Sequence, residues 1–270
     1  MKYTSIQASP RFRPYLKAIW MLESKQEEEG HRYRFTPDGY AELCFHIKDP
    51  WDYSVNGEKE TFNLKTKMVG QYSRSLDVIL PSSIKTIYIK FYPWAFYAVF
   101  GIPLHIFTNN HIQFDDVFKD AAAYLAEQFS TCDTLEQVRQ IIEPWLLKKL
   151  QKAQSYDKDC VKIIKVISED DGVVKSDQLI AQYTRSKRRL QQQFKTLVGL
   201  SPKQFANVKR VHKATQLVKS NIPLMEITHL LGYYDQAHFI HDFKYFTGLT
   251  PRNYCQKISP EGKFNSFSTL

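Results

Sequence analysis

Two stretches of this chain share one pattern of residues. Residues 186–205 read SKRRLQQQFKTLVGLSPKQF, and residues 235–254 read DQAHFIHDFKYFTGLTPRNY, 49 positions further on. When Gly199 is aligned with Gly248, the Gly-Leu-Ser-Pro segment pairs with Gly-Leu-Thr-Pro, and apolar residues pair with apolar residues. These pairs are Leu190 with Phe239, Phe194 with Phe243, and Phe205 with Tyr254. A repeat of this length indicates that one supersecondary unit is built twice.

Each stretch carries the signals of a helix that follows a shorter helix and a turn. Ser186 and Asp235 occupy equivalent positions, and both residue types are good N-caps. Upstream, LIAQYTRS (179–186) and ITHLLGYYD (227–235) each read as a short apolar helix that ends in a tight turn. Helix, turn and second helix form a helix-turn-helix, so the chain is predicted to contain this motif twice.

The second helix of each motif has an apolar stripe and an opposite polar face. In the first motif the stripe is Leu190, Phe194 and Leu197. Arginine can hold guanine and glutamine can hold adenine with two hydrogen bonds, and an apolar group can contact the thymine methyl. We therefore expect the polar faces to read bases in the major groove. The expected base-contacting residues are Arg188, Gln191 and Gln192 in the first motif, and Gln236, Ala237, Ile240 and His241 in the second.

The excess positive charge lies in the same part of the chain. Residues 151–270 hold 19 Lys and Arg against 10 Asp and Glu, whereas residues 1–150 hold 18 of each kind. A charge run is often only a solvated face, but its confinement to one domain favours a polyanionic partner, nucleic acid before membrane. The expected contacts with the DNA backbone are Lys187, Arg189, Lys195, Lys203, Arg210 and Lys244.

A longer helix is predicted between the two motifs, over residues 202–219. It follows Ser201, a good N-cap, and has Pro202 at its first position. At about 1.5 Å per residue it spans about 27 Å, which approaches the ~34 Å of one DNA turn. One chain could then grip two successive segments of the major groove.

The front of the chain reads as β structure. In YAELCFHI (40–47) apolar residues alternate with Glu42, Cys44 and His46, which predicts a strand with these three on one face. SIKTIYIKFY (83–92) predicts another strand, and Asn56-Gly57 predicts a hairpin turn. Glu42, Cys44 and His46 are candidate ligand-binding residues. They are also metal-ligand types, but a complete metal site needs more ligands, so we expect no metal.

The remainder of the chain reads as helical. Helices are predicted in 118–154, the second of them opened by Thr134 and interrupted by Pro144, and further helices over 157–169, 176–183, 187–198, 202–219, 224–231 and 236–247. The expected fold class is α+β with two domains: antiparallel β structure plus helices first, an all-helical domain second. The expected parts are a β-rich domain (1–117), helices that connect the domains or form a dimer contact (118–154), a DNA-binding domain (155–258) and a C-terminal tail (259–270).

Several classes of protein are disfavoured. The chain has no G-x-S-x-G, P-loop, G-x-G-x-x-G or H-E-x-x-H motif, and its four cysteines form no C-x-x-C pair. The first ten residues lack the apolar core of a signal peptide, and the apolar stretch 92–107 is too short to span a bilayer. We therefore expect a cytoplasmic protein that is not an enzyme, that uses no cofactor and that does not enter a membrane.

The sharpest motif is IPLMEITHLLGYYDQAHFIHDFKYFTGLTPRNY (222–254). An Ile-led short helix is followed by a Gly-aromatic turn, then His-Phe and Phe-Lys, then Gly-x-Thr-Pro-x-x-Tyr. With this motif, residues 157–257 resemble the AraC/XylS family of bacterial transcription regulators. The resemblance implies a seven-helix domain that binds double-stranded DNA at promoters, and its base-reading positions fall on the seven residues named above. Two features depart from the family pattern: Leu230-Leu231 before Gly232, and His241, where the family often has Arg.

The front half carries PDGYAELCFHI (37–47), MVGQYSR (68–74) and IKFYPWAFYAVFGIP (89–103). These segments resemble a sensor domain found ahead of such DNA-binding domains. The resemblance implies a cupin-like β-barrel that binds a small-molecule effector and contacts a second copy of the chain, as a homodimer. RNA polymerase is a further expected partner of the protein. Two alternatives stay open. One is a ligand-binding or enzymatic β-barrel whose helical half is a protein-interaction module; the other is a regulator that needs no ligand.

Overall fold

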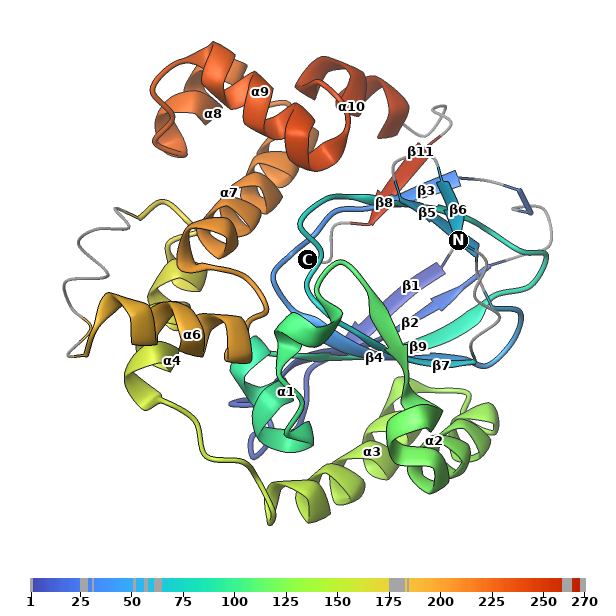
Figure 1. Cartoon of the computed structure of the whole chain (residues 1–270). Helices are drawn as coiled ribbons and strands as arrows, with labels where there is room; N and C mark the ends of the chain where they lie inside the picture. Colours follow the sequence, from blue (N-terminus) through green and yellow to red (C-terminus); the bar gives the residue numbers. More distant parts are fainter. Residues whose placement is uncertain are drawn as a thin grey trace.

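The N-terminal half of the molecule contains two β-sheets, and the C-terminal half is helical (Figure 1). The structure is a computed structural model that describes residues 2–24, 29–30, 32–50, 52–55, 58–60, 65–174, 183, 185–258 and 264–267. The predicted α+β fold class, with antiparallel β structure first and a helical domain second, is confirmed.

The larger sheet has six strands in the order β1-β2-β9-β4-β7-β10, and all neighbours are antiparallel. In β4, Leu43 and Phe45 face the helices, as the alternation predicted. The sequence did not predict β1, β2 or β10, and β2 is buried on both faces, which removes the alternation. The strands are β1 (Lys2–Ile6), β2 (Leu16–Glu23), β4 (Ala41–His46), β7 (Thr66–Val69), β9 (Lys85–Phe91) and β10 (His111–Gln113).

The smaller sheet has five strands in the order β11-β3-β8-β5-β6. The predicted hairpin is present, because β5 pairs with β6, although Asn56 and Gly57 lie outside the described residues. The expected C-terminal tail contributes a strand, β11, which pairs with β3 in parallel orientation. The strands are β3 (Arg32–Phe35), β5 (Asp52–Val55), β6 (Glu58–Glu60), β8 (Leu76–Ile79) and β11 (Phe264–Phe267).

Helices cover the outer face of the larger sheet (Figure 1). Thr134 opens the second long helix with a capping box to Gln137, as predicted. The predicted interruption at Pro144 was wrong, because the helix continues through this proline. Pro144 is exposed, so water can reach the carbonyl that loses its hydrogen bond. The elements are α1 (Pro93–Phe100), η2 (Leu104–Phe107), α2 (Phe114–Ser130) and α3 (Leu135–Leu150).

The C-terminal helices form two groups that α7 connects (Figure 1). The predicted helices agree with the structure to within one residue, except that the one expected at 176–183 lies, apart from Tyr183, outside the described residues. None of the helices in the described part of the chain is both long and apolar enough to cross a bilayer. The helices are α4 (Lys158–Glu169), α6 (Lys187–Leu197), α7 (Pro202–Lys219), α8 (Leu224–Leu230), α9 (Gln236–Thr247) and α10 (Pro251–Ile258).

Each helical group has its own apolar core. The first group is α4 and α6, the second is α8, α9 and α10, and α7 packs against both. In the first, Leu190, Phe194 and Leu197 of α6 are fully buried among residues of α4 and α7. Trp94 and Ala95 of α1 belong to this same core, so the first group shares its interior with the N-terminal half. The second core is built around Phe239 and Phe243 of α9 and Tyr254 of α10.

We predict that Phe194→Ala lowers the free energy of unfolding by about 3–5 kcal/mol, because it leaves a cavity in the core of the first group. Gln192→Ala, on the exposed face of the same helix, should change it by less than about 0.5 kcal/mol. Urea unfolding of both variants measures the difference. A loss below about 1 kcal/mol for Phe194→Ala would contradict the buried position of this ring.

Candidate functional site

The polar face of α6 is exposed along its length. Ser186 caps the helix by accepting a hydrogen bond from the Arg189 N–H at 3.3 Å, which fixes where the helix starts. Because the apolar stripe is buried, the opposite side of the helix faces solvent. Its exposed residues include all the predicted ones: Lys187, Arg188, Arg189, Gln191, Gln192 and Lys195.

The equivalent face of α9 is also open. Asp235 caps the helix by accepting from the His238 N–H at 2.7 Å. Gln236, Ala237, His241 and Lys244 are exposed, whereas Ile240 is half-buried against the core of the second group.

The turn before α9 explains the unusual Leu230-Leu231 pair. Leu231 is buried in the core of the second group, whereas Leu230 is exposed. Gly232 follows with a φ of 65°, a conformation that favours glycine. The turn therefore uses one of the two leucines as an anchor and leaves the other in solvent.

Two predicted backbone contacts lie on the helix that joins the motifs. Ser201 and Gln204 cap α7 with a reciprocal pair of hydrogen bonds, and Lys203 is exposed. Arg210 is different. Its guanidinium donates to the Asn207 side chain at 2.8 Å and lies 4.4 Å from the centre of the Tyr233 ring. Arg210 therefore packs inside the second group, and a contact with DNA would require it to leave these partners.

The N-terminal half holds the end of α9. Arg34 donates to the Thr247 carbonyl at 2.8 Å, and the Ser75 N–H donates to the Phe246 carbonyl at 2.8 Å. The Arg74 guanidinium lies over the Tyr245 ring at 4.4 Å. His241 and Lys244 line a cleft together with this surface. Part of the α9 polar face therefore adjoins the β-sheet half.

A turn of the N-terminal half also packs against α7. Lys209 of α7 is buried and donates from Nζ to the Asp38 carbonyl at 3.0 Å. Gly39 has a φ of 83°, and a Cβ placed there would lie 2.8 Å from the Lys209 side chain and 2.9 Å from the Phe205 ring. The turn 36–39 therefore accepts no side chain at this glycine without moving away from α7.

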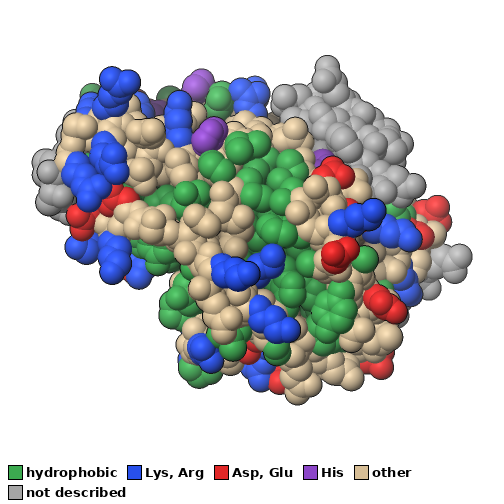
Figure 2. Space-filling model, turned by 60° about the horizontal axis from the view of Figure 1, so that its bottom comes forward, with side chains coloured by type: hydrophobic (Ala, Val, Ile, Leu, Met, Phe, Trp, Pro, Cys, Tyr) green, Lys and Arg blue, Asp and Glu red, His purple; other side chains and the backbone are tan. Residues whose placement is uncertain are grey.

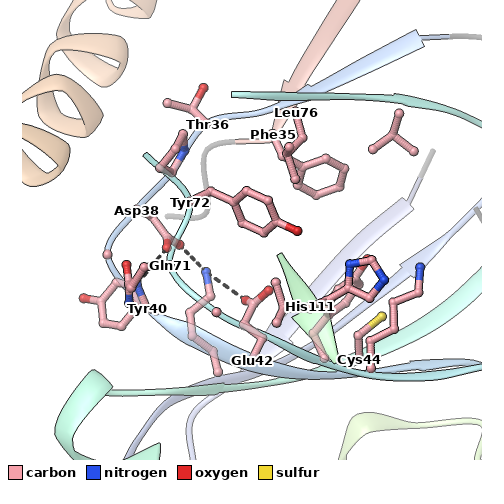
Figure 3. A pocket seen from close by; sticks show the side chains of 18 of the residues that line it. Phe35, Thr36, Asp38, Tyr40, Glu42, Cys44, Gln71, Tyr72, Leu76 and His111 are labelled. Carbon is pink, nitrogen blue, oxygen red and sulfur yellow. Dashed lines mark hydrogen bonds and ion pairs between the residues drawn. The ribbon is translucent and has the colours of Figure 1, made fainter. Parts of the chain in front are cut away.

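The other side of this turn lines a cavity of about 150 Å³ between the two sheets. Figure 3 shows Phe35 and Leu76 above the Tyr72 ring, with Glu42 and Cys44 on the opposite wall. The three residues predicted as ligand-binding, Glu42, Cys44 and His46, all line the cavity. Whether they bind a ligand stays a prediction. No group of three or more metal-ligand side chains is placed to hold a metal within the part of the chain that the structure describes.

The cavity contains a buried group of three charges. Lys90 Nζ lies 2.6 Å from Asp38 and 3.3 Å from Glu42, and dashed lines mark these ion pairs at Asp38 and Glu42 in Figure 3. The Trp20 indole donates to Glu42 at 3.0 Å. Burial alone would raise the pKa of Asp38, but Lys90, together with His212 and Lys209, outweighs burial and holds this pKa well below its ordinary value. Burial raises the pKa of Glu42 despite the same lysine.

At the opposite end of the cavity, the Cys44 thiol and the imidazoles of His46 and His111 are uncharged at neutral pH. Cys44 Sγ lies 3.5 Å from His46 Nε2, and His46 Nδ1 lies 3.0 Å from the Thr86 hydroxyl. Burial raises the pKa of Cys44 to about 12. Burial, helped by Lys67, lowers the pKa of His111 to about 4 and that of His46 well below its ordinary value.

Sequence reasoning missed the parts of the cavity that come from distant segments. It predicted the face of β4, but it assigned no role to Trp20, Lys90 or Gln71. One available signal was Lys90 between Ile89 and Phe91 in a predicted strand, because a buried lysine requires a partner. The partner, Asp38, lies 52 positions away in the sequence.

Two known families match this chain. Residues 179–257 match a family described as a helix-turn-helix domain, and residues 4–113 match one described as a domain of unknown function, DUF6597. The HTH-type transcriptional regulator MtrA of Neisseria gonorrhoeae is 31% identical over 93 residues, which are 34% of this chain and 31% of that protein. This chain thus covers about a third of the length of that curated relative.

Solved structures are similar at low identity. ToxT from Vibrio cholerae matches 94% of this chain and 98% of its own, with 11% identity and a TM-score of 0.49. One ToxT structure holds an unsaturated fatty acid. The C-terminal domain of AraT from Geobacillus stearothermophilus matches 38% of this chain and 87% of its own, with 22% identity and a TM-score of 0.35.

We predict that stability falls as the pH is lowered from about 6.5 to 4. With a pKa of about 4, folded His111 stays neutral in this range, whereas the unfolded chain takes up a proton near pH 6.5. The unfolded state then binds more protons, so the free energy of unfolding falls, by on the order of 2 kcal/mol for this one residue. Urea unfolding at pH 7.5 and 4.5 measures the fall.

His111→Gln should reduce this pH dependence, whereas the control His105→Gln, at an exposed position, should not. An equal fall in the wild-type protein and in His111→Gln would show that His111 is not the group responsible.

Proposed function

We propose that this chain is a regulator of the AraC/XylS family, which binds double-stranded DNA and regulates transcription, because residues 179–257 match a helix-turn-helix family and residues 222–254 carry the motif that resembles AraC/XylS regulators. The matched relative MtrA is named an HTH-type transcriptional regulator. The observation that carries the proposal is the pair of exposed polar faces on α6 and α9, joined by α7.

The two faces are suited to different parts of a binding site. On α6, Arg188, Gln191 and Gln192 present side chains that can each make two hydrogen bonds with a purine. On α9, Gln236 can do the same, while Ala237 offers a methyl group to thymine. Two helices on one chain would contact two successive segments of the major groove, which a single helix-turn-helix contacts only as a dimer.

The DNA backbone would be held by the exposed cations around these faces. In the face of the molecule shown in Figure 2, Lys and Arg side chains gather at the left, over the helical half. Such contacts set the register of the protein on DNA without reading sequence, and they make affinity fall steeply with salt. The candidates are Lys187, Arg189, Lys195, Lys203 and Lys244, with Arg210 only after it leaves its present partners.

The cavity between the sheets is the proposed site of control by a small molecule. Its wall includes Asp38 and Gly39, and the same turn packs against Lys209 and Phe205 of α7. A ligand that moves this turn therefore changes how α7 is held. Binding of RNA polymerase and of a second copy of the chain, and a cytoplasmic location, stay predictions.

We predict that Arg188→Ala weakens binding by about 1–3 kcal/mol at one base position and relaxes the choice of base there. Lys187→Ala, its neighbour, should weaken binding to all sequences about equally. A binding-site selection with wild-type protein and both variants measures the difference. Uniform weakening by Arg188→Ala would limit that residue to the backbone, and no duplex binding by the wild type would reject the proposed function.

We further predict that Gly39→Ala increases the affinity for DNA severalfold. Its methyl group would push the turn away from α7, and this loosens the sheet half, which adjoins part of the α9 polar face. Gly30→Ala is the matched control: Gly30 also has a positive φ, of 76°, but nothing lies within 4 Å of its Cβ position. Mobility shifts on a selected duplex compare the two, and equal affinities would contradict this route of control.

A further inference from the structure

A second cleft lies where the two halves of the molecule meet, at the C-terminal end of α4. The loop before β2 and the start of β2 contribute Arg13 and Lys17 to its lining, and α4 contributes Lys165. Its volume is about 360 Å³. The cleft is separate from the cavity between the sheets, although Tyr40 lines both. A ligand in this cleft would therefore contact both halves of the molecule.

Aromatic rings form part of the lining. Tyr92 and Trp94 are stacked, with ring centroids 4.8 Å apart and 14° between their planes, and the Tyr40 ring lies 5.8 Å from that of Tyr92. The Tyr92 N–H donates to the Tyr15 carbonyl at 3.0 Å, which fixes the loop before β2 beside these rings. Burial raises the pKa of both Tyr40 and Tyr92, so their hydroxyls are uncharged at neutral pH. An aromatic ligand gains from packing against such rings.

The charged side chains of the lining leave an excess of positive charge. Among the described residues that line the cleft there are three cations and one acid, which gives a net charge of +2. The cations are Arg13, Lys17 and Lys165, and the acid is Glu169. All four are exposed, and none of the three cations forms an ion pair with another described residue. Unpaired cations around one cleft favour an anion, and a doubly charged group such as phosphate matches the net charge.

The acids at the end of α4 do not cancel this charge. Asp170 and Asp171 follow Glu169 in the sequence, but they line a different cleft, and Asp171 lies 3.0 Å from Lys213. Because the cations are exposed, water and salt screen each contact with an anion. A ligand therefore needs the aromatic contact as well as the charge.

From the aromatic lining and the unpaired cations we propose that this cleft binds a small molecule with a phosphate group on an aromatic ring. The phosphate lies among Arg13, Lys17 and Lys165, and the ring lies against Tyr92 and Tyr40. The site is separate from the cavity proposed for control of DNA binding, and its occupancy is measured without DNA. Failure of this proposal is therefore distinguishable from failure of the proposed function.

Three probes separate the contributions of the ring and the charge: phenyl phosphate, inorganic phosphate and benzyl alcohol. Isothermal titration of the full chain at pH 7.5, low salt and millimolar probe should show phenyl phosphate binding about tenfold more tightly than either other probe. Lys165→Met removes one cation and should weaken phenyl phosphate about threefold. The matched control is Lys158→Met, at an exposed position of the same helix outside the cleft, which should leave the affinity unchanged.

A second variant gives a result that unfolding cannot imitate. Glu169→Gln removes the one acid of the described lining and should strengthen phenyl phosphate about threefold. Equal affinities for phenyl phosphate and inorganic phosphate would overturn the proposal in favour of a site for a free anion. Displacement of phenyl phosphate by a short DNA duplex would overturn it in favour of a contact with the DNA backbone. No binding of phenyl phosphate, or equal weakening by Lys165→Met and Lys158→Met, would also overturn it.

Discussion

Asp38 connects the two halves of the molecule through two kinds of contact. Its carboxylate binds Lys90 on the floor of the cavity, and its backbone carbonyl accepts a hydrogen bond from Lys209 of the helical half. Both lysines are buried, so neither charge is screened by solvent. Burial lowers the pKa of Lys209 to about 8, whereas the two acids raise that of Lys90 despite burial. Both lysines thus contact one turn, but the pKa of Lys209 is lowered and the pKa of Lys90 is raised.

The position of this turn gives the cavity and the helical half a common wall. A ligand that binds only the native state stabilises that state. Here the wall is backed by α7, the helix that sets the distance between α6 and α9. Under the proposed control by a ligand, a small shift of this wall would be amplified at α7, because packed interfaces change between discrete arrangements and do not deform continuously.

The sequence predicted local structure well wherever one face of an element is exposed. The stripe of α6, the caps at Ser186, Thr134 and Ser201, and the alternation in β4 all follow from short-range rules. It failed where burial is complete on both faces, as in β2, and where a helix tolerates an exposed proline, as at Pro144. The cavity could not be predicted from the sequence, because Trp20, Asp38 and Lys90 meet only after the strands pair.

The two helical groups are attached to the sheet half by different kinds of contact. The first shares an apolar core with it through Trp94 and Ala95, so separation would expose that core to water. The second is attached through polar contacts from Arg34 and Ser75 to carbonyls at the end of α9, and through β11, which follows α10 and pairs with β3. Phe246 of α9 also packs in the core of the first group. Release of the second group from the sheet half would therefore break hydrogen bonds and a strand pairing, whereas release of the first would expose an apolar core.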